Sequence, residues 1–275
     1  MSSHETIKRF DDIWRGWEEL SPTPERFAQH CEGRARFLAA LERHLLQANP
    51  CRALEVGCGS AIDLAILAQR VPSLQAIGVD ISAEALRVAR GFLAYAGGRH
   101  WLCRGDAFAL PFADGAFGMV YSQGVLEHFR DPWAALREQV RILAGEGILV
   151  INVPQRFTGY TMHKRRAIRR ETWPWGWETE FTATELLAMG RNLGLESVEC
   201  FGSQYWRAWG EPTWILRDLY GKIHRRNPLA RITPFPQLEQ LYNRVWTWLE
   251  GRYGHLFLQN VVVVFRKLRI EQTGR

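Results

Sequence analysis

The chain has 275 residues, a formal net charge of +6 and 47% hydrophobic residues, so it can form a full core in one large α/β domain with added segments. The amino terminus is polar and charged, and no apolar run approaches the roughly 18 residues of a membrane helix, so we expect neither a signal peptide nor a membrane span. The five cysteines lack C-x-x-C spacing, which argues against a zinc site or a disulfide framework and favours reduced thiols in the cytoplasm.

Residues 1–49 are predicted to form a helical cover, because apolar residues recur three to four positions apart from residue 26 to 46. From residue 50 to 155, short apolar runs alternate with helical stretches. The predicted strands are Ala53–Val56, Ala76–Val79, Trp101–Cys103, Gly118–Tyr121 and Gly147–Val153. The predicted helices between them are Ile62–Arg70, Ala83–Tyr95 and Pro132–Leu143. Such alternation with right-handed crossovers predicts a doubly wound, mostly parallel sheet, the Rossmann-like form of the α/β class.

The remaining 120 residues are predicted to add a variable segment (156–202), an inserted helical lid (203–255) and a last strand with a frayed tail (256–275). The stretch from Gln155 to Glu180 is basic and tryptophan-rich and is expected to be irregular. Thr182 begins a capping box that opens a helix to Asn192, and a strand follows to Phe201. The lid is expected to be helical around 214–223 and 237–250, and the last strand to run from 256 to 267.

A glycine-rich turn follows the first predicted strand and directly precedes a helix. Gly57 and Gly59 permit positive φ angles and a close approach of another molecule to the backbone. The next helix presents free N–H groups and the positive end of its dipole to whatever lies in the turn. A cleft for a small polar ligand at the carboxyl end of the first strand is therefore predicted.

Polar residues also fall where the other strands should end. Asp80 closes the second strand, Asp106 follows the third, and Ser122 and Gln123 follow the fourth. Because such strand ends converge at one edge of a parallel sheet, these groups can line one cleft with Glu55 of the first strand. Any single aspartate could instead be a helix cap or a turn residue, but four such positions together with the turn favour the cleft.

Five stretches, in order and at suitable spacing, resemble the motifs of class I S-adenosylmethionine-dependent methyltransferases: 54–61 (LEVGCGSA), 78–82 (GVDIS), 105–112 (GDAFALPF), 126–132 (LEHFRDP) and 145–150 (GEGILV). They are most similar to the type 11 subgroup, which holds many small-molecule and quinone methyltransferases. The resemblance implies a seven-stranded sheet whose last two strands form an antiparallel hairpin.

The resemblance further implies a site for S-adenosylmethionine at Glu55, Gly57, Cys58, Gly59, Asp80, Ile81, Asp106, Ala107, Ser122 and Gln123. The turn would face the methionine part, Asp80 would hold the ribose with Ile81 against the adenine ring, and Asp106 would accept from the adenine amino group. Ala61 stands where the family commonly has a third glycine. A nicotinamide-binding turn is disfavoured, because Ile62 occupies the last glycine position of that motif.

Methyl transfer from a sulfonium needs alignment and exclusion of water more than dedicated catalytic groups. His128, just beyond the fourth strand, is the candidate base if the acceptor must lose a proton, although it could instead only shape the pocket. His163, Tyr160 and Glu178 are weaker candidates. No paired carboxylates suggest a magnesium site, so no metal is expected.

The acceptor is predicted to lie among the basic, tryptophan-rich segments, with candidate contacts at Tyr160, His163, Trp175, Trp177 and Tyr205. Tryptophan beside arginine suits a small or amphiphilic acceptor, anionic and lipid-linked ones included, or peripheral contact with an anionic membrane surface. Two alternatives remain: a tRNA or rRNA methyltransferase that uses this basic face, and a non-catalytic interaction protein with the same fold. The tryptophans could also simply pack the lid onto the core.

Overall fold

The computed structural model describes residues 3–17, 21–47, 51–203 and 236–269. Seven strands form one sheet in the order β3-β2-β1-β4-β5-β7-β6. The strands are β1 (Arg52–Val56), β2 (Gln75–Asp80), β3 (Arg99–Arg104), β4 (Phe117–Gln123), β5 (Leu143–Pro154), β6 (Leu195–Ser203) and β7 (Asn260–Lys267). The first five strands pair in parallel, and β7 pairs antiparallel with both β5 and β6. The predicted fold class, including the antiparallel hairpin, is confirmed.

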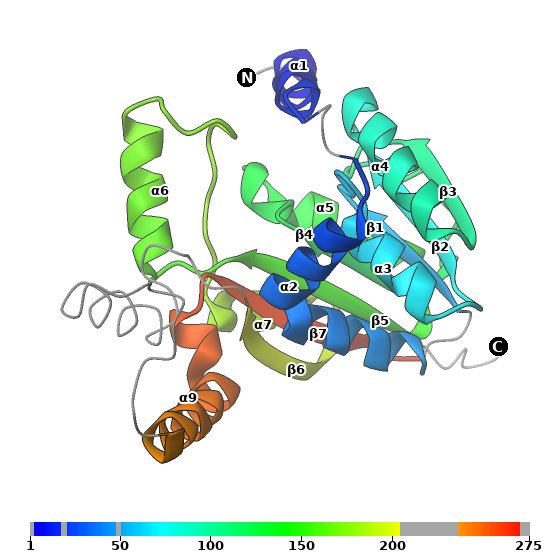
Figure 1. The fold of residues 1–275 in the computed structure, drawn as a ribbon. Helices are drawn as coiled ribbons and strands as arrows, with labels where there is room; N and C mark the ends of the chain where they lie inside the picture. The colour runs from blue at the N-terminus through cyan, green and yellow to red at the C-terminus, as the bar shows by residue number, and fades with distance from the viewer. Residues whose placement is uncertain (1–2, 18–20, 48–50, 204–235, 270–275) are drawn as a thin grey trace.

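Helices cover both faces of the sheet (Figure 1). They are α1 (Ser3–Arg15), α2 (Pro24–Leu45), α3 (Ile62–Arg70), α4 (Ala83–Ala96), η1 (Leu126–His128, a 3-10 turn), α5 (Pro132–Ile142), α6 (Gly159–Arg169), α7 (Ala183–Asn192) and α9 (Pro236–Phe257). Apolar side chains of α2, α3 and α4 form one core layer, and those of α5 and α7 form the other. Helices α1 and α6 flank the edge at which β1 to β5 end, so they frame any site built there (Figure 1).

Two sequence-based assignments are wrong. The stretch expected to be irregular contains helix α6, whose buried residues are Thr161 and Lys164 rather than apolar side chains, so no apolar periodicity marked it. The last strand begins at Asn260 and not at Leu256, because Leu256 and Phe257 continue α9. The first helix expected in the lid lies outside the described residues.

An ion-paired carboxylate fixes α2 against α3. The Asp63 carboxylate is 2.8 Å from His30 Nε2 and accepts a hydrogen bond from Arg34 Nη1 at 2.7 Å. Burial alone would favour the neutral acid, but Arg34 and His30 outweigh burial and hold the pKa of Asp63 at about 2. The cover formed by α2 is thus attached to α3 by charge as well as by apolar packing.

Asp63→Asn is expected to lower the free energy of unfolding by about 2 kcal/mol at neutral pH, because a shift of nearly two pKa units corresponds to that amount. Since the folded pKa lies below the ordinary 3.8, this stability is present above pH 3.8 and is lost as the pH falls toward 2. Urea unfolding at several pH values should therefore show the variant and the wild type converging in acid. A constant difference between them would contradict this assignment.

Candidate active site at the carboxyl edge of the sheet

The turn after β1 has the backbone that its sequence predicts. Gly57 and Gly59 adopt φ angles of 65° and 51°, and the Cys58 N–H donates to the Val79 carbonyl at 3.0 Å. Ala61 also has a positive φ, 54°, and begins α3. Alanine at the position of the family's third glycine therefore keeps the left-handed conformation, at the modest strain of a non-glycine residue there.

The Cys58 side chain points away from the open side of this turn. Its Sγ lies 2.9 Å from the position that a Cβ would take on Gly78, in the core beneath β2. Burial raises the pKa of the thiol well above its ordinary value. Cys58 can therefore meet a ligand in the turn through its backbone but not as a thiolate.

Asp80 joins the glycine turn to the end of β2. Its Oδ2 accepts from the Gly59 N–H and its Oδ1 accepts from the Ser82 N–H, both at 2.9 Å. Burial raises its pKa above the ordinary value. Each carboxylate oxygen can accept a second hydrogen bond, so Asp80 can hold the turn and still receive two hydroxyl groups.

The end of β3 lies beside Asp80, because the Gly105 N–H donates to the Asp80 carbonyl at 3.0 Å. Asp106 follows on the surface, where its Oδ1 accepts from the Phe108 N–H at 2.9 Å. Ala107 is partly buried, and the Ile81 carbonyl accepts from Arg104 Nε at 2.9 Å. The residues predicted around an adenosine group thus lie along the ends of two adjacent strands.

The residues predicted at β1 and β4 are more deeply placed. Glu55 is buried and accepts a hydrogen bond from the Tyr121 hydroxyl at 3.1 Å, on the sheet face that α2 covers. Ser122 is buried, and its Oγ has no hydrogen-bond partner. Gln123 Oε1 accepts from Asn152 Nδ2 at 3.2 Å, which links the ends of β4 and β5.

Helix α1 covers the glycine turn. The sequence predicted a helical cover but not the residues that make this contact. The Trp14 ring lies 2.6 Å from the position that a Cβ would take on Gly59. Asp11 Oδ1 accepts from the Ser82 hydroxyl at 2.6 Å, and Arg15 pairs with Glu84 at 3.4 Å. Helix α1 thus packs on α4, outside the sheet, and covers the turn from there (Figure 1).

Aromatic side chains surround His128 at the end of η1. The Phe10 ring meets the imidazole edge to face with centroids 5.3 Å apart, and the Trp175 ring centroid is 6.4 Å away. Burial lowers the pKa of His128, so its imidazole is neutral at neutral pH. Trp177 is more exposed and stacks under Arg130, whose guanidinium carbon lies 4.8 Å from the ring centroid.

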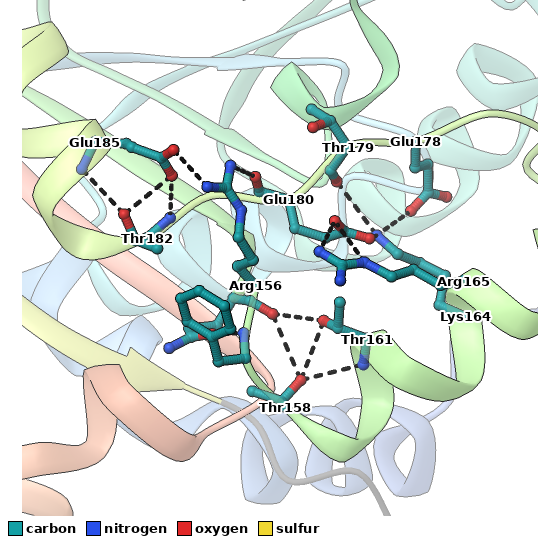
Figure 2. Close-up of polar contacts among 12 residues, drawn as sticks. Arg156, Thr158, Thr161, Lys164, Arg165, Glu178, Thr179, Glu180, Thr182 and Glu185 are labelled. Atoms are coloured by element: carbon teal, nitrogen blue, oxygen red, sulfur yellow. Dashed lines mark hydrogen bonds and ion pairs between the residues drawn. The ribbon is translucent and has the colours of Figure 1, made fainter.

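A charged network links α6 to the segment after it (Figure 2). Lys164 is completely buried, with Nζ 3.0 Å from Glu178 Oε2 and 3.4 Å from Glu180 Oε1. Arg165 pairs with the other Glu180 oxygen at 2.9 Å, and Trp173 Nε1 donates to Glu178 at 2.7 Å. The basic segment expected from the sequence therefore has its only lysine in the interior.

Glu127, which the sequence analysis did not select, is an acid of this region whose pKa is strongly shifted. Burial and the neighbouring Glu178 raise the pKa of Glu127 to about 8. Its position in the motif placed it near the end of β4, but only the structure reveals that its side chain is buried.

Of the predicted acceptor-side residues, Tyr160 packs edge to face against Trp173 with centroids 6.1 Å apart, and His163 lies on the exposed face of α6. Tyr205 lies outside the described residues.

Within the described ranges, no group of three histidine, cysteine, aspartate or glutamate residues is arranged to hold a metal ion. None of the helices described is long and apolar enough to cross a membrane. An open hollow of about 470 Å³ lies between α1 and the segment that follows α6, lined by Glu5, Lys8, Arg9, Asp12, Ile13 and Pro174. None of the candidate cofactor residues lines it.

The strand order, with β7 antiparallel between β5 and β6, is the fold of solved class I S-adenosylmethionine-dependent methyltransferases. Residues 54–151 match the model of the methyltransferase domain family, and this part of the chain belongs to that family. S-adenosylmethionine is the cofactor that the family implies. The fold also resembles a solved methyltransferase from Thermotoga maritima, described as a possible histamine N-methyltransferase, with a TM-score of 0.52 and 21% identity over 88% of this chain and 97% of that one.

Two curated relatives show the sequence similarity. Ajmaline N-methyltransferase of Rauvolfia serpentina is 29% identical over 168 residues, 54% of this chain and 57% of that protein. A demethylmenaquinone methyltransferase of Thermus thermophilus is 36% identical over 107 residues, 38% of this chain and 48% of that protein. The chain thus spans about half the length of these relatives, and the similarity is centred on the cofactor domain.

Proposed function

We propose that the protein transfers the methyl group of S-adenosylmethionine to a small-molecule acceptor at the carboxyl edge of the sheet. The observation that carries the proposal is the double hydrogen bonding of Asp80, which ties the glycine turn to the end of β2 and leaves acceptor capacity on both oxygens. The family of residues 54–151 and the small-molecule acceptors named for the two relatives support the same class.

The residues fit the cofactor. Asp80 would accept the two ribose hydroxyls, Ile81 and Ala107 would flank the adenine, and Asp106 would accept from its amino group. The N–H groups and missing side chains of the glycine turn would receive the methionine part. When bound, S-adenosylmethionine supplies an activated methyl group on a sulfonium.

The aromatic side chains of α1 and of the segment after α6 would exclude water from the reaction. Phe10, His128 and Trp175 pack together beyond the end of β4, where we place the acceptor. A neutral His128 can orient an acceptor or take its proton. The rate of the in-line displacement then depends on how well these aromatic side chains align the acceptor with the methyl group.

A small acceptor fits the described part of the chain better than a nucleic acid. Of the cations on α6, Lys164 and Arg165 are paired with glutamates, which leaves a reduced basic face. An amphiphilic acceptor, or contact with an anionic membrane surface, remains compatible with Trp177 and its exposed surroundings.

Binding and transfer can be measured separately. Titration calorimetry with S-adenosylhomocysteine tests the cofactor site, and incubation of the protein and S-adenosylmethionine with a metabolite extract tests transfer, read as a gain of one CH₂ by mass spectrometry. We expect binding, and a methylated product that depends on the protein. Absence of binding at millimolar ligand would support the non-catalytic alternative.

Trp14→Ala is expected to tighten S-adenosylhomocysteine binding roughly fivefold, because the ring now lies against Gly59 and a competing contact of about 1 kcal/mol must be given up. Trp101→Ala, an exposed tryptophan on β3, is the matched control and should leave the dissociation constant unchanged. Calorimetry with both variants checks this. Weaker binding by the Trp14 variant would show that the ring helps to hold the ligand instead.

A further inference from the structure

Glu127 is a buried carboxyl group with an unused oxygen. The residue is 3% exposed, and its Oε2 has no hydrogen-bond partner. The side chain turns back toward the end of β4, with Oε1 3.5 Å from the position that a Cβ would take on Gly124. An unpartnered buried acceptor costs stability, so Oε2 is a position where a bound ligand could supply the missing hydrogen-bond donor.

The cations near Glu127 are already engaged. Lys164 is shared between Glu178 and Glu180, and Arg165 pairs with Glu180. The set thus holds three carboxyl groups (Glu127, Glu178 and Glu180) and two cations (Lys164 and Arg165). With Glu127 ionised, this set of five groups carries one carboxylate in excess, and a single positive charge on a ligand would balance it. Two further cations lie against the flanking segment: Arg9 against Gly176, and Arg130 over the Trp177 ring.

The titratable side chains of His128 and Tyr160, which lie near Glu127, do not supply that charge. His128 follows it directly and is neutral at neutral pH, because burial lowers its pKa. Tyr160 is held in its neutral form, because burial and then Glu178 raise its pKa. The Thr179 N–H donates to the Glu127 carbonyl at 2.8 Å, which keeps the acidic segment against it.

Aromatic rings lie around His128, the residue that follows Glu127. Phe10 and Trp175 lie around His128, with ring centroids 6.2 Å apart, and Tyr160 packs on Trp173. Aromatic faces attract cations, and the attraction strengthens where water is excluded. A carboxylate whose neighbour in the chain, His128, is surrounded by such rings is suited to an organic ammonium group and poorly suited to an anion.

We propose that the methyl acceptor is an amine, bound as its ammonium cation with an N–H donated to Glu127 Oε2, and that Glu127 takes the proton that frees the nitrogen lone pair. This inference rests on the proposed methyltransferase function and names the class of its substrate. It assigns Glu127 as a catalytic residue of the acceptor site and makes the reaction an N-methylation.

Protons and electrons balance in the proposed reaction. The ammonium gives one proton to the Glu127 carboxylate and becomes a neutral amine. The nitrogen lone pair forms the new N–C bond as the C–S bond breaks, and the electrons of that bond stay on sulfur, which leaves as a neutral thioether. The methylated nitrogen carries the positive charge away, and Glu127 returns its proton to solvent.

The test uses the full chain saturated with S-adenosylhomocysteine and titrated with arylalkylamines and alkylamines, primary to tertiary. Phenylethanol and phenylpropionate serve as the neutral and anionic counterparts of phenylethylamine. We expect amines to bind and both counterparts to fail. With a pKa of about 8, Glu127 is mostly protonated in the free protein at neutral pH, so a bound ammonium should expel nearly one proton. Titrations in buffers of different ionisation enthalpy measure that proton directly in the unmodified protein.

Glu127→Gln keeps the shape and removes the charge. We expect at least roughly tenfold weaker amine binding, no proton release and unchanged S-adenosylhomocysteine binding. Glu196→Gln, which alters an exposed carboxylate on β6, is the matched control and should change none of the three. Failure of every amine to bind, equal affinity of the glutamine variant, or binding without proton release would overturn the inference. Failure of S-adenosylhomocysteine itself to bind would instead overturn the proposed function.

Discussion

Lys164→Met is expected to lower the free energy of unfolding by about 3–5 kcal/mol, since it leaves two buried carboxylates without their shared cation. Lys164 Nζ lies 3.0 Å from Glu178 and 3.4 Å from Glu180, and the lysine is completely buried. The methionine fills a similar volume, so the loss reports on charge and not on a cavity. Urea unfolding followed by circular dichroism measures it.

Arg165→Met provides the matched control on the same helix. Its side chain is 45% exposed and pairs with Glu180 alone, so we expect a loss of less than about 1 kcal/mol. Equal losses for the two variants would mean that the buried lysine contributes no more than a surface pair. In that case the network of Figure 2 would not be what holds α6 in place.

Asp80→Ala is expected to raise the dissociation constant for S-adenosylhomocysteine at least about tenfold, because the hydrogen bonds that we assign to the ribose would be lost. The structure adds a second cause. The N–H groups of Gly59 and Ser82 would lose the carboxylate that now accepts from both, so the glycine turn would lose part of its support. Calorimetry gives the affinity, and urea unfolding gives the accompanying loss of stability.

Two comparisons separate these causes. Asp80→Asn keeps one carbonyl oxygen for the turn and removes the charge, so it should retain more stability than the alanine variant. Asp12→Ala, on the exposed side of α1, should affect neither quantity strongly. An unchanged dissociation constant in the Asp80 variants would contradict the proposed cofactor site.

The elements with an apolar face or a capping motif could be predicted from the sequence. Helix α3 runs from Ile62 to Arg70 as expected, and α7 begins after the Thr182 capping box. Helix α6 could not be predicted, because the side that faces inward is polar and is satisfied by glutamates that follow it in the chain. Such pairing depends on the path of the chain and leaves no periodic pattern.

The same distinction applies to the site. Gly59 and Asp80 were selected because strand ends of a parallel sheet meet at one edge, and the structure brings the two into direct hydrogen bonding. Trp14 and Glu127 were missed. The importance of each depends on burial and on contacts with distant segments, and neither position differs in sequence from an ordinary amphipathic helix or a common family motif.

The polar docking of α6 also determines how that helix can vary. Apolar helix faces tolerate small rotations and slides, because dispersion contacts have little directional preference. Lys164 meets two carboxylates whose own positions are set by Trp173 and Arg165, so a modest rotation of α6 about its axis would break several directional contacts together. Natural variation on the outward face of α6 should therefore change the protein's surface while leaving the wall of the proposed acceptor site in one orientation.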